Sequence, residues 1–203
     1  MPRAGLSLDR VASAGADLAD EAGFGAVTVS VLARRLGVRT PSLYTYVEGN
    51  ADLRVRIAAL ALEESADLVT AALSGRRGSA ALAAYADAWR DFARRHPGRY
   101  DATRQPVPET GGAGSTSMIA AGRRHADLAR DVLSGYRIAP TEQTHAIRLL
   151  GSLVHGYVSL ELAGSFAHSE PSSESSWHYT IAQLDRWLAS PPPPEEGRRA
   201  TAG

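Results

Sequence analysis

The 203-residue chain contains no cysteine, and all 22 of its lysine-plus-arginine residues are arginine. Without thiols the chain forms neither a disulfide framework nor a thiolate metal site. A Walker A loop needs a lysine on the phosphates, and Schiff-base and pyridoxal-phosphate chemistry need a lysine amine. The absence of lysine therefore excludes P-loop nucleotidases and lysine-dependent enzymes.

Long apolar runs and an excess of one charge are missing as well. No apolar segment approaches the ~20 residues of a membrane-spanning helix, and residues 1–5 lack the apolar stretch of a secretory signal. We therefore expect a cytoplasmic protein without a membrane partner. The 22 acidic residues balance the basic ones, so any contact with nucleic acid depends on local clustering of positive charge.

Helical periodicity dominates what is present. Apolar side chains recur at i, i+3, i+4 and i+7 in segment after segment, and no segment alternates as a strand does. Ser7 and Thr28 stand where they can cap helix starts, and Gly23 and Gly37 stand where helices can end. The predicted helices cover residues 8–22, 29–36, 40–47, 51–73, 82–96, 118–133, 141–166 and 177–188, with loops at 106–117 and 168–176. The sequence therefore predicts an all-α fold, in which Pro97 and Gly98 end the fifth helix.

The segment from residue 28 to 47, T-V-S-V-L-A-R-R-L-G-V-R-T-P-S-L-Y-T-Y-V, predicts two short helices joined by a tight turn. Ala33 is small where the helices cross, Gly37 allows a positive φ, and Val38 and Leu43 are apolar plugs. Thr40 is expected to cap the second helix, which this arrangement holds out toward the major groove of DNA.

Several polar side chains of this segment suit base and phosphate contacts: Arg39, Thr40, Ser42, Thr45 and Tyr46. Thr28 can direct the start of its helix toward a phosphate. Three short helices also occur as plain bundle elements, in which Tyr44 and Tyr46 would be core aromatics, and periodicity alone leaves both interpretations open.

Residues 7–60 resemble the tetracycline-repressor (TetR) family of regulators, most clearly in A-D-L-A-D-E-A-G-F-G-A-V-T-V-S-V-L-A-R-R-L-G-V-R-T-P-S-L-Y-T-Y-V-E-G-N-A-D-L. The L-G-V turn and the L-Y-x-Y/H-V recognition helix carry the match. The resemblance implies that Tyr44 bonds a DNA phosphate and that the groove is faced by Thr40, Pro41, Ser42, Thr45 and Tyr46. Asn50 stands where the family has a lysine that touches a phosphate, and it can hydrogen-bond but adds no charge. The resemblance thus implies either a lower phosphate affinity or an affinity carried by Arg34, Arg35, Arg39 and Arg54.

The C-terminal region resembles a ligand-domain subfamily of these regulators that is named for a Trp-His-Gly motif. F-A-R-R-H-P-G-R-Y at residues 92–100 and V-H-G-Y-V-S-L-E at residues 154–161 carry this match, although Leu153 or a neighbour stands at the tryptophan position. The helix over 141–166 is apolar on nearly every side and needs partners beyond one bundle. Together with the last helix it predicts a two-fold interface and a homodimer.

A ligand cavity is expected between the helices that carry Trp89, Phe92, Met118, His125 and Tyr157, although aromatic stripes are also typical of plain core. The loop at 106–117 would be its entrance. The spacing of His96, His125, His145 and His155 is poor for a metal, so we expect neither metal nor cofactor, and structural or pocket histidines instead.

We therefore predict a sequence-specific DNA-binding regulator, a repressor of double-stranded operator DNA that an unknown small-molecule effector releases. The predicted domains are a helix-turn-helix unit at 5–65, a helical ligand-binding and dimerisation unit at 66–190, and a disordered tail at 191–203. A helical enzyme or a structural bundle without DNA binding is the alternative. The chain has no G-x-S-x-G, G-x-G-x-x-G or H-E-x-x-H motif, so no enzyme is expected.

Overall fold

The computed structural model describes residues 5–107 and 112–190, and every regular element in these ranges is helical. The prediction of an all-α fold is therefore confirmed. The elements are α1 (Leu8–Ala22), η1 (Phe24–Ala26), α2 (Val29–Arg35), α3 (Thr40–Leu43), α4 (Asn50–Leu73), α5 (Gly78–Arg95), α6 (Pro97–Thr103), α7 (Ala113–Leu133), η2 (Pro140–Glu142), α8 (Gln143–Leu162) and α9 (Ser173–Ala189).

Local side-chain chemistry sets the first helix boundaries. The Ser7 hydroxyl accepts a hydrogen bond from the Arg10 amide at 3.2 Å, and the Thr28 hydroxyl accepts one from the Val31 amide at 3.2 Å. Both predicted caps are confirmed. The expected cap at Thr40 is wrong, because Arg39 is the N-cap residue and no side chain caps α3.

Several segments after α4 differ from the sequence prediction, among them α9, which begins at Ser173 inside the loop expected at 168–176. Pro97 and Gly98 do not only end α5, since Pro97 also begins α6, where a proline fits because the first turn needs no amide donor. α7 begins at Ala113, five residues before the predicted start at Met118. Gly114 is buried there, and a Cβ on it would lie 3.2 Å from a Val55 methyl carbon of α4. Tertiary packing thus holds a glycine-rich segment in a helix.

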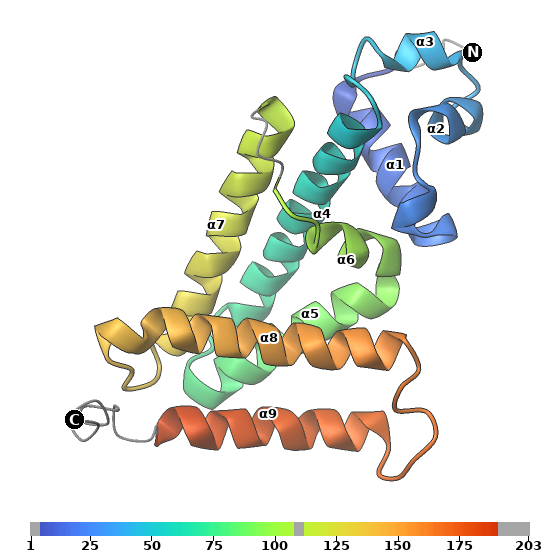
Figure 1. Ribbon diagram of the computed structural model, residues 1–203. Helices are drawn as coiled ribbons and strands as arrows, with labels where there is room; N and C mark the ends of the chain where they lie inside the picture. The colour runs from blue at the N-terminus through green and yellow to red at the C-terminus, as the bar shows by residue number, and fades with distance from the viewer. Residues whose placement is uncertain (1–4, 108–111, 191–203) are drawn as a thin grey trace, which may run out of the picture.

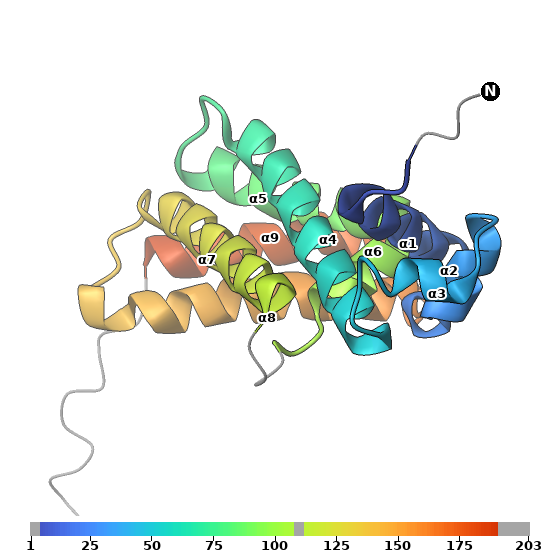
Figure 2. The same cartoon turned by 90° about the horizontal axis from the view of Figure 1, so that it is seen from above.

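α4 is the central element of the molecule (Figure 1). Its first half carries the small bundle of α1, α2 and α3, and α5, α6 and α7 pack along it. α8 and α9 run antiparallel and side by side as an outer layer, which both views show (Figures 1 and 2). α4 runs unbroken through the predicted boundary at residues 65 and 66, so the two predicted domains share one continuous helix.

The described part of the chain contains no helix that is long and apolar enough to cross a membrane. One cluster of buried apolar side chains extends from α1 to α9. The predicted disordered tail at 191–203 lies outside the described residues, so its state stays a prediction.

Candidate functional site

The helix-turn-helix is built around buried aliphatic side chains. Leu32 of α2 and Leu43 of α3 are fully buried, Val38 between them is half-buried, and Gly37 turns the chain with φ +66°. The predicted turn and plug are confirmed. Because Leu43 anchors α3 from behind, the opposite side of this short helix faces away from the domain.

That outward side carries most of the predicted DNA contacts. Pro41, Ser42 and Thr45 are exposed, and Tyr44 is 56% exposed and so is not a core aromatic. Arg39 just before α3 is exposed as well, while Thr40 is half-buried. These residues form one accessible polar edge, as their role as DNA contacts requires, and that role stays a prediction.

Tyr46 lies differently from its neighbours. It is half-buried, and its hydroxyl donates a hydrogen bond to the Leu6 carbonyl at 2.9 Å. The hydroxyl therefore ties the residues after α3 to the segment before α1. The Tyr46 hydroxyl is hydrogen-bonded within the domain, so the predicted contact of this residue with the groove of DNA would have to come from its ring.

Asn50 links two helix starts. Its side-chain Oδ1 accepts a hydrogen bond from the Val29 amide at 2.8 Å, while Thr28 caps the same helix through the Val31 amide. Asn50 thus ties the first residue of α4 to the first residue of α2. Sequence analysis missed this contact because the two residues are 21 positions apart and no local pattern joins them.

The four arginines that were expected to replace the missing lysine differ in what they contact. Arg35 forms a two-pronged ion pair with Glu21 at 2.5 and 2.6 Å, and the Arg54 guanidinium lies 4.3 Å above the Phe24 ring. Arg34 and Arg39 are exposed at the helix-turn-helix. The charge available to DNA therefore concentrates on the α2 and α3 side of the domain.

A cluster of uncharged polar and aromatic side chains lies where five helices meet. We call it the neutral cluster, and its members are Ser65 (α4), Trp89 (α5), Tyr100 (α6), His125 (α7) and His155 (α8). The Trp89 ring lies between the two imidazoles, with centroids 4.7 Å from each. The Tyr100 hydroxyl lies 3.1 Å from His155 Nδ1.

The structure brings together only part of the predicted ligand pocket. Phe92 stacks edge-on against Trp89 at 6.2 Å, and buried Met118 lies two turns before His125 on α7. Tyr157 lies elsewhere, because its ring packs on Trp177 at 5.1 Å, between α8 and α9. The grouping of all five residues is therefore corrected.

Sequence analysis did not select Ser65 or Tyr100 for the pocket, and it named His155 only among the histidines expected to be structural or pocket residues. A signal for two of them was present, because Tyr100 ends the H-P-G-R-Y segment and His155 stands in V-H-G. Both segments carry the C-terminal resemblance. Treating Tyr100 and His155 as candidate site residues would therefore have pointed to a contact between α6 and α8.

Burial keeps the neutral cluster uncharged. It lowers the pKa of the His155 imidazole to about 4, and it also lowers the pKa of His125. Burial raises the pKa of the Tyr100 hydroxyl. At neutral pH all three groups therefore carry no charge. In residues 5–107 and 112–190 no three histidine or carboxylate side chains gather into a metal site.

A second cluster, opposite in character, lies where α6 meets α1 and α4. We call it the charged junction, and its members are Asp17, Asp20, Glu64, His96 and Arg99. The Arg99 guanidinium contacts Asp17 at 2.6 Å and Glu64 at 3.0 Å and also pairs with Asp20. Asp20 additionally accepts the Arg99 amide at 2.8 Å and contacts His96 Nδ1 at 3.0 Å. Arg99 is only 8% exposed, so the start of α6 is held firmly against α1.

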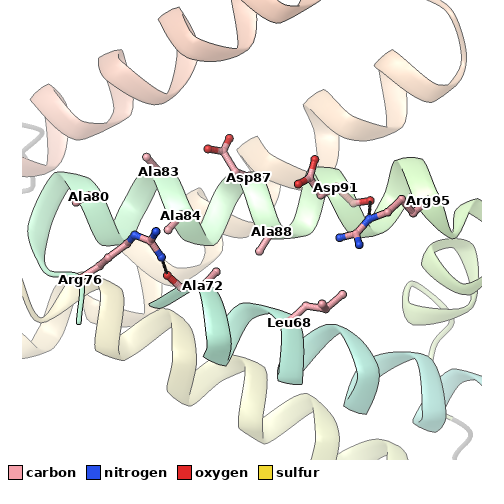
Figure 3. A pocket seen from close by; sticks show the side chains of 10 residues that line it. All are labelled: Leu68, Ala72, Arg76, Ala80, Ala83, Ala84, Asp87, Ala88, Asp91 and Arg95. Carbon is pink, nitrogen blue, oxygen red and sulfur yellow. Dashed lines mark hydrogen bonds between the residues drawn. The ribbon is translucent and has the colours of Figure 1, made fainter. Parts of the chain in front are cut away.

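A surface cleft of about 400 Å³ runs between α4 and α5 (Figure 3). Half of its lining residues are alanines, with Asp87 and Asp91 on α5 and Arg76 and Arg95 toward its ends. The Asp87 carboxylate also accepts a hydrogen bond from the Trp177 indole at 2.7 Å. The cleft lies on the outer side of α5 and is separate from the neutral cluster.

The outer face of α8 and α9 leaves large apolar side chains uncovered. Leu160 is 51% exposed and Tyr179 is 66% exposed, and Leu149 and Trp187 are exposed too. Leu150, Val154 and Val158 on the other side of α8 are buried. The expectation that α8 needs partners on further faces agrees with this distribution.

Comparisons with known proteins agree with this architecture. The family model of the tetracyclin repressor-like C-terminal domain matches residues 82–184. YobS of Bacillus subtilis, a helix-turn-helix-type transcriptional regulator, is 31% identical over 176 residues, which cover 86% of this chain and 88% of YobS. Rv0681 of Mycobacterium tuberculosis, also a helix-turn-helix-type transcriptional regulator, is 32% identical over 160 residues, which cover 78% of this chain and 72% of Rv0681.

Solved structures show the same fold. The regulatory protein SCO4313 has a TM-score of 0.68 at 25% identity, and the match covers 87% of this chain and 94% of that one. PfmR of Thermus thermophilus, a TetR-family regulator, has a TM-score of 0.62 at 19% identity, covering 91% and 96%. The full-length relatives and the C-terminal match together show that this chain belongs to the TetR family of helix-turn-helix transcriptional regulators.

Proposed function

We propose that this regulator binds double-stranded operator DNA as a homodimer, represses transcription, and leaves the DNA when a small-molecule effector binds. The observation that carries the proposal is the exposed edge of α3, where Ser42, Tyr44 and Thr45 point away from the domain while Leu43 anchors the helix. Such an edge can enter a major groove without rearrangement of the domain. We place the protein in the cytoplasm, with its operator.

The homodimer is supported by the apolar stripe on the outer layer. Leu149, Leu153, Gly156 and Leu160 fall at i, i+4, i+7 and i+11 and so share one side of α8. A two-fold copy would cover this stripe and the exposed Trp187 of α9. Leu160→Arg should therefore give a monomer in light scattering, and because Leu160 is exposed, the subunit itself should stay folded.

The route from effector to DNA is supported by the position of α6. Tyr100 belongs to the neutral cluster, and the preceding residue, Arg99, belongs to the charged junction. A molecule that displaces Tyr100 would shift α6, and α6 would then move α1 through Arg99. Release requires that the effector binds the shifted conformation more tightly than the DNA-bound one.

A gel-shift assay on the DNA upstream of the protein's own gene tests the proposal. The unmodified protein should shift this fragment, and the Thr40→Ala/Tyr44→Ala double variant should not. Arg39→Ala should weaken binding and reduce its salt dependence, since a phosphate contact releases counterions. Arg137→Ala, an exposed arginine between α7 and α8, is the matched control and should bind as the unmodified protein does.

The same assay separates the alternatives. A structural bundle or a helical enzyme would shift no fragment at any salt concentration. Unchanged binding by the Thr40/Tyr44 double variant would refute the role of α3 even if some DNA were bound.

A further inference from the structure

The neutral cluster contains two buried polar atoms with no hydrogen-bond partner among the described residues. They are the indole Nε1 of Trp89 and the Nδ1 of His125. Trp89 is 3% exposed, and the centroids of the two rings are 4.7 Å apart. Buried polar atoms in folded proteins nearly always have a partner, so two orphans in one cluster need an explanation.

The hydrogen bonds around His125 decide what its orphan atom can do. His125 Nε2 lies 2.9 Å from the Leu62 carbonyl, which can only accept, so Nε2 carries the proton. The Ser65 hydroxyl donates to the same carbonyl at 3.0 Å and lies 3.1 Å from Nε2. Burial lowers the pKa of His125, so the ring holds a single proton at neutral pH. Its Nδ1 is therefore an acceptor that lacks a donor.

The indole of Trp89 presents the complementary case. An indole nitrogen can only donate, so Trp89 offers a donor that lacks an acceptor. The buried Tyr85 hydroxyl lies one turn earlier on α5. Burial raises its pKa and the neighbouring Trp89 N–H lowers it by a smaller amount, but the two groups do not meet the geometry of a hydrogen bond. The cluster thus holds one unused donor and one unused acceptor on adjacent rings, with no charge on either.

Building on the proposed function, we infer that the effector is an uncharged molecule whose polar end carries an acceptor and a donor side by side, as a carboxamide does. Its carbonyl oxygen accepts from Trp89 Nε1, and its N–H donates to His125 Nδ1. An anionic end is disfavoured, because none of the five members of the cluster is charged and its imidazoles are held neutral. The cation beside the cluster, the Arg104 guanidinium 5.3 Å from the Tyr100 ring centroid, already pairs with Asp101 at 3.2 Å. The surrounding rings of Phe92 and Tyr100 suit an aromatic body.

The first test needs no ligand and compares two buried tryptophans. Trp177 is 1% exposed and its indole donates to Asp87 at 2.7 Å, whereas the Trp89 indole has no partner among the described residues. Both Trp89→Phe and Trp177→Phe remove ring volume, but only the second breaks a hydrogen bond and leaves a carboxylate without it. We expect Trp177→Phe to lower the melting temperature by several degrees more than Trp89→Phe. Equal losses would mean that the Trp89 N–H is already satisfied and would overturn the inference.

The second test uses three probes of the same size: benzamide, acetophenone and benzoate. Benzamide offers acceptor and donor, acetophenone only the acceptor, and benzoate a charge. Titrated against the dimer at about pH 7.5 and followed by tryptophan fluorescence, benzamide should bind roughly tenfold more tightly than either of the others, as one added hydrogen bond allows. Tighter binding of benzoate, or equal binding of all three, would contradict the inference.

Variants then locate the site. His125→Gln keeps a donor for the Leu62 carbonyl but moves its acceptor away from the Nδ1 position, and it should cancel the preference of benzamide over acetophenone, as should Trp89→Phe. Ala84→Leu, which fills the α4–α5 cleft, is the control and should change nothing. Loss of benzamide binding in Ala84→Leu alone would move the site to the cleft and refute the inference. These readouts need no DNA, so they fail independently of the proposed function.

Discussion

Two consecutive residues of α6 belong to opposite kinds of buried polar site. Arg99 stands in the charged junction, where every carboxylate meets a cation and the guanidinium contacts three of them. Tyr100 stands in the neutral cluster, where burial keeps imidazoles uncharged and two polar atoms have no partner among the described residues. A group of linked ion pairs resists movement because movement separates opposite charges, whereas the two unpartnered atoms of the neutral cluster can still form hydrogen bonds. The first suits a rigid joint to the DNA-binding unit, and the second suits a place where a molecule can bind.

The largest loss of stability is expected from a substitution that breaks the charged junction. Arg99→Leu leaves Asp17, Asp20 and Glu64 close together without their shared cation. We expect the free energy of unfolding to fall by about 3 kcal/mol. This loss is at the low end of the range for breaking a buried ion pair, because Asp17 and Glu64 reach solvent. Urea unfolding measures the loss. Arg94→Leu is the control, because Arg94 is 47% exposed beside Glu161 and such pairs contribute at most about 1 kcal/mol. Similar losses in both variants would show that the junction is not a special anchor.

The next prediction concerns the pH dependence of stability, which separates the neutral cluster from its charged neighbours. The pKa of His155 is lowered to about 4 in the folded protein, so between about pH 6.5 and 4 the unfolded chain binds more protons. Stability should therefore fall as the pH falls through this window, by up to about 3 kcal/mol. The pKa of Glu161 is lowered to about 2 by its bond with Arg90, so the stability that this pair contributes is kept until the pH falls below about 4.5.

Urea unfolding at about pH 7.0, 5.5 and 4.5 measures this slope. His155→Asn should reduce this slope, because the substituted side chain cannot take up a proton in either state, and His125, whose pKa burial also lowers, should account for part of what remains. A slope that stays unchanged in the variant would show that His155 does not contribute to the acid sensitivity.

The smallest effect is expected at the close contact between α6 and α1 beside the charged junction. A Cβ on Gly98 would lie 1.9 Å from the Ala19 carbonyl oxygen and 2.5 Å from the Asp20 amide nitrogen, and both are backbone atoms. Gly98→Ala should push α6 off α1 and cost about 1–3 kcal/mol. Gly122→Ala on α7 meets open space and should stabilise the protein by about 0.5–1 kcal/mol. Thermal unfolding of the two variants should thus shift in opposite directions, and a shared direction would contradict the close packing.

Features that depend on neighbouring residues could be predicted from the order of amino acids. The caps at Ser7 and Thr28, the positive φ of Gly37 and the plug at Leu43 are of this kind, because capping, turning and amphipathic spacing act over three or four positions. The two short helices and the turn between them follow from these local rules, and so does the all-α fold, whereas the choice of a DNA-binding helix-turn-helix over a plain bundle came from the family resemblance. The same rules failed at Pro97, since a proline can end one helix and begin the next.

Which side chains meet was settled by the packing of the helices. Tyr46 turned its hydroxyl to Leu6, 40 positions away, and Asn50 joined the starts of α2 and α4. The neutral cluster drew one residue from each of five helices, while Tyr157, predicted with them, packed between α8 and α9. A helical period shows that a side chain faces inward, but the crossing of the helices determines which partner it finds there, and that crossing depends on packing across the whole core.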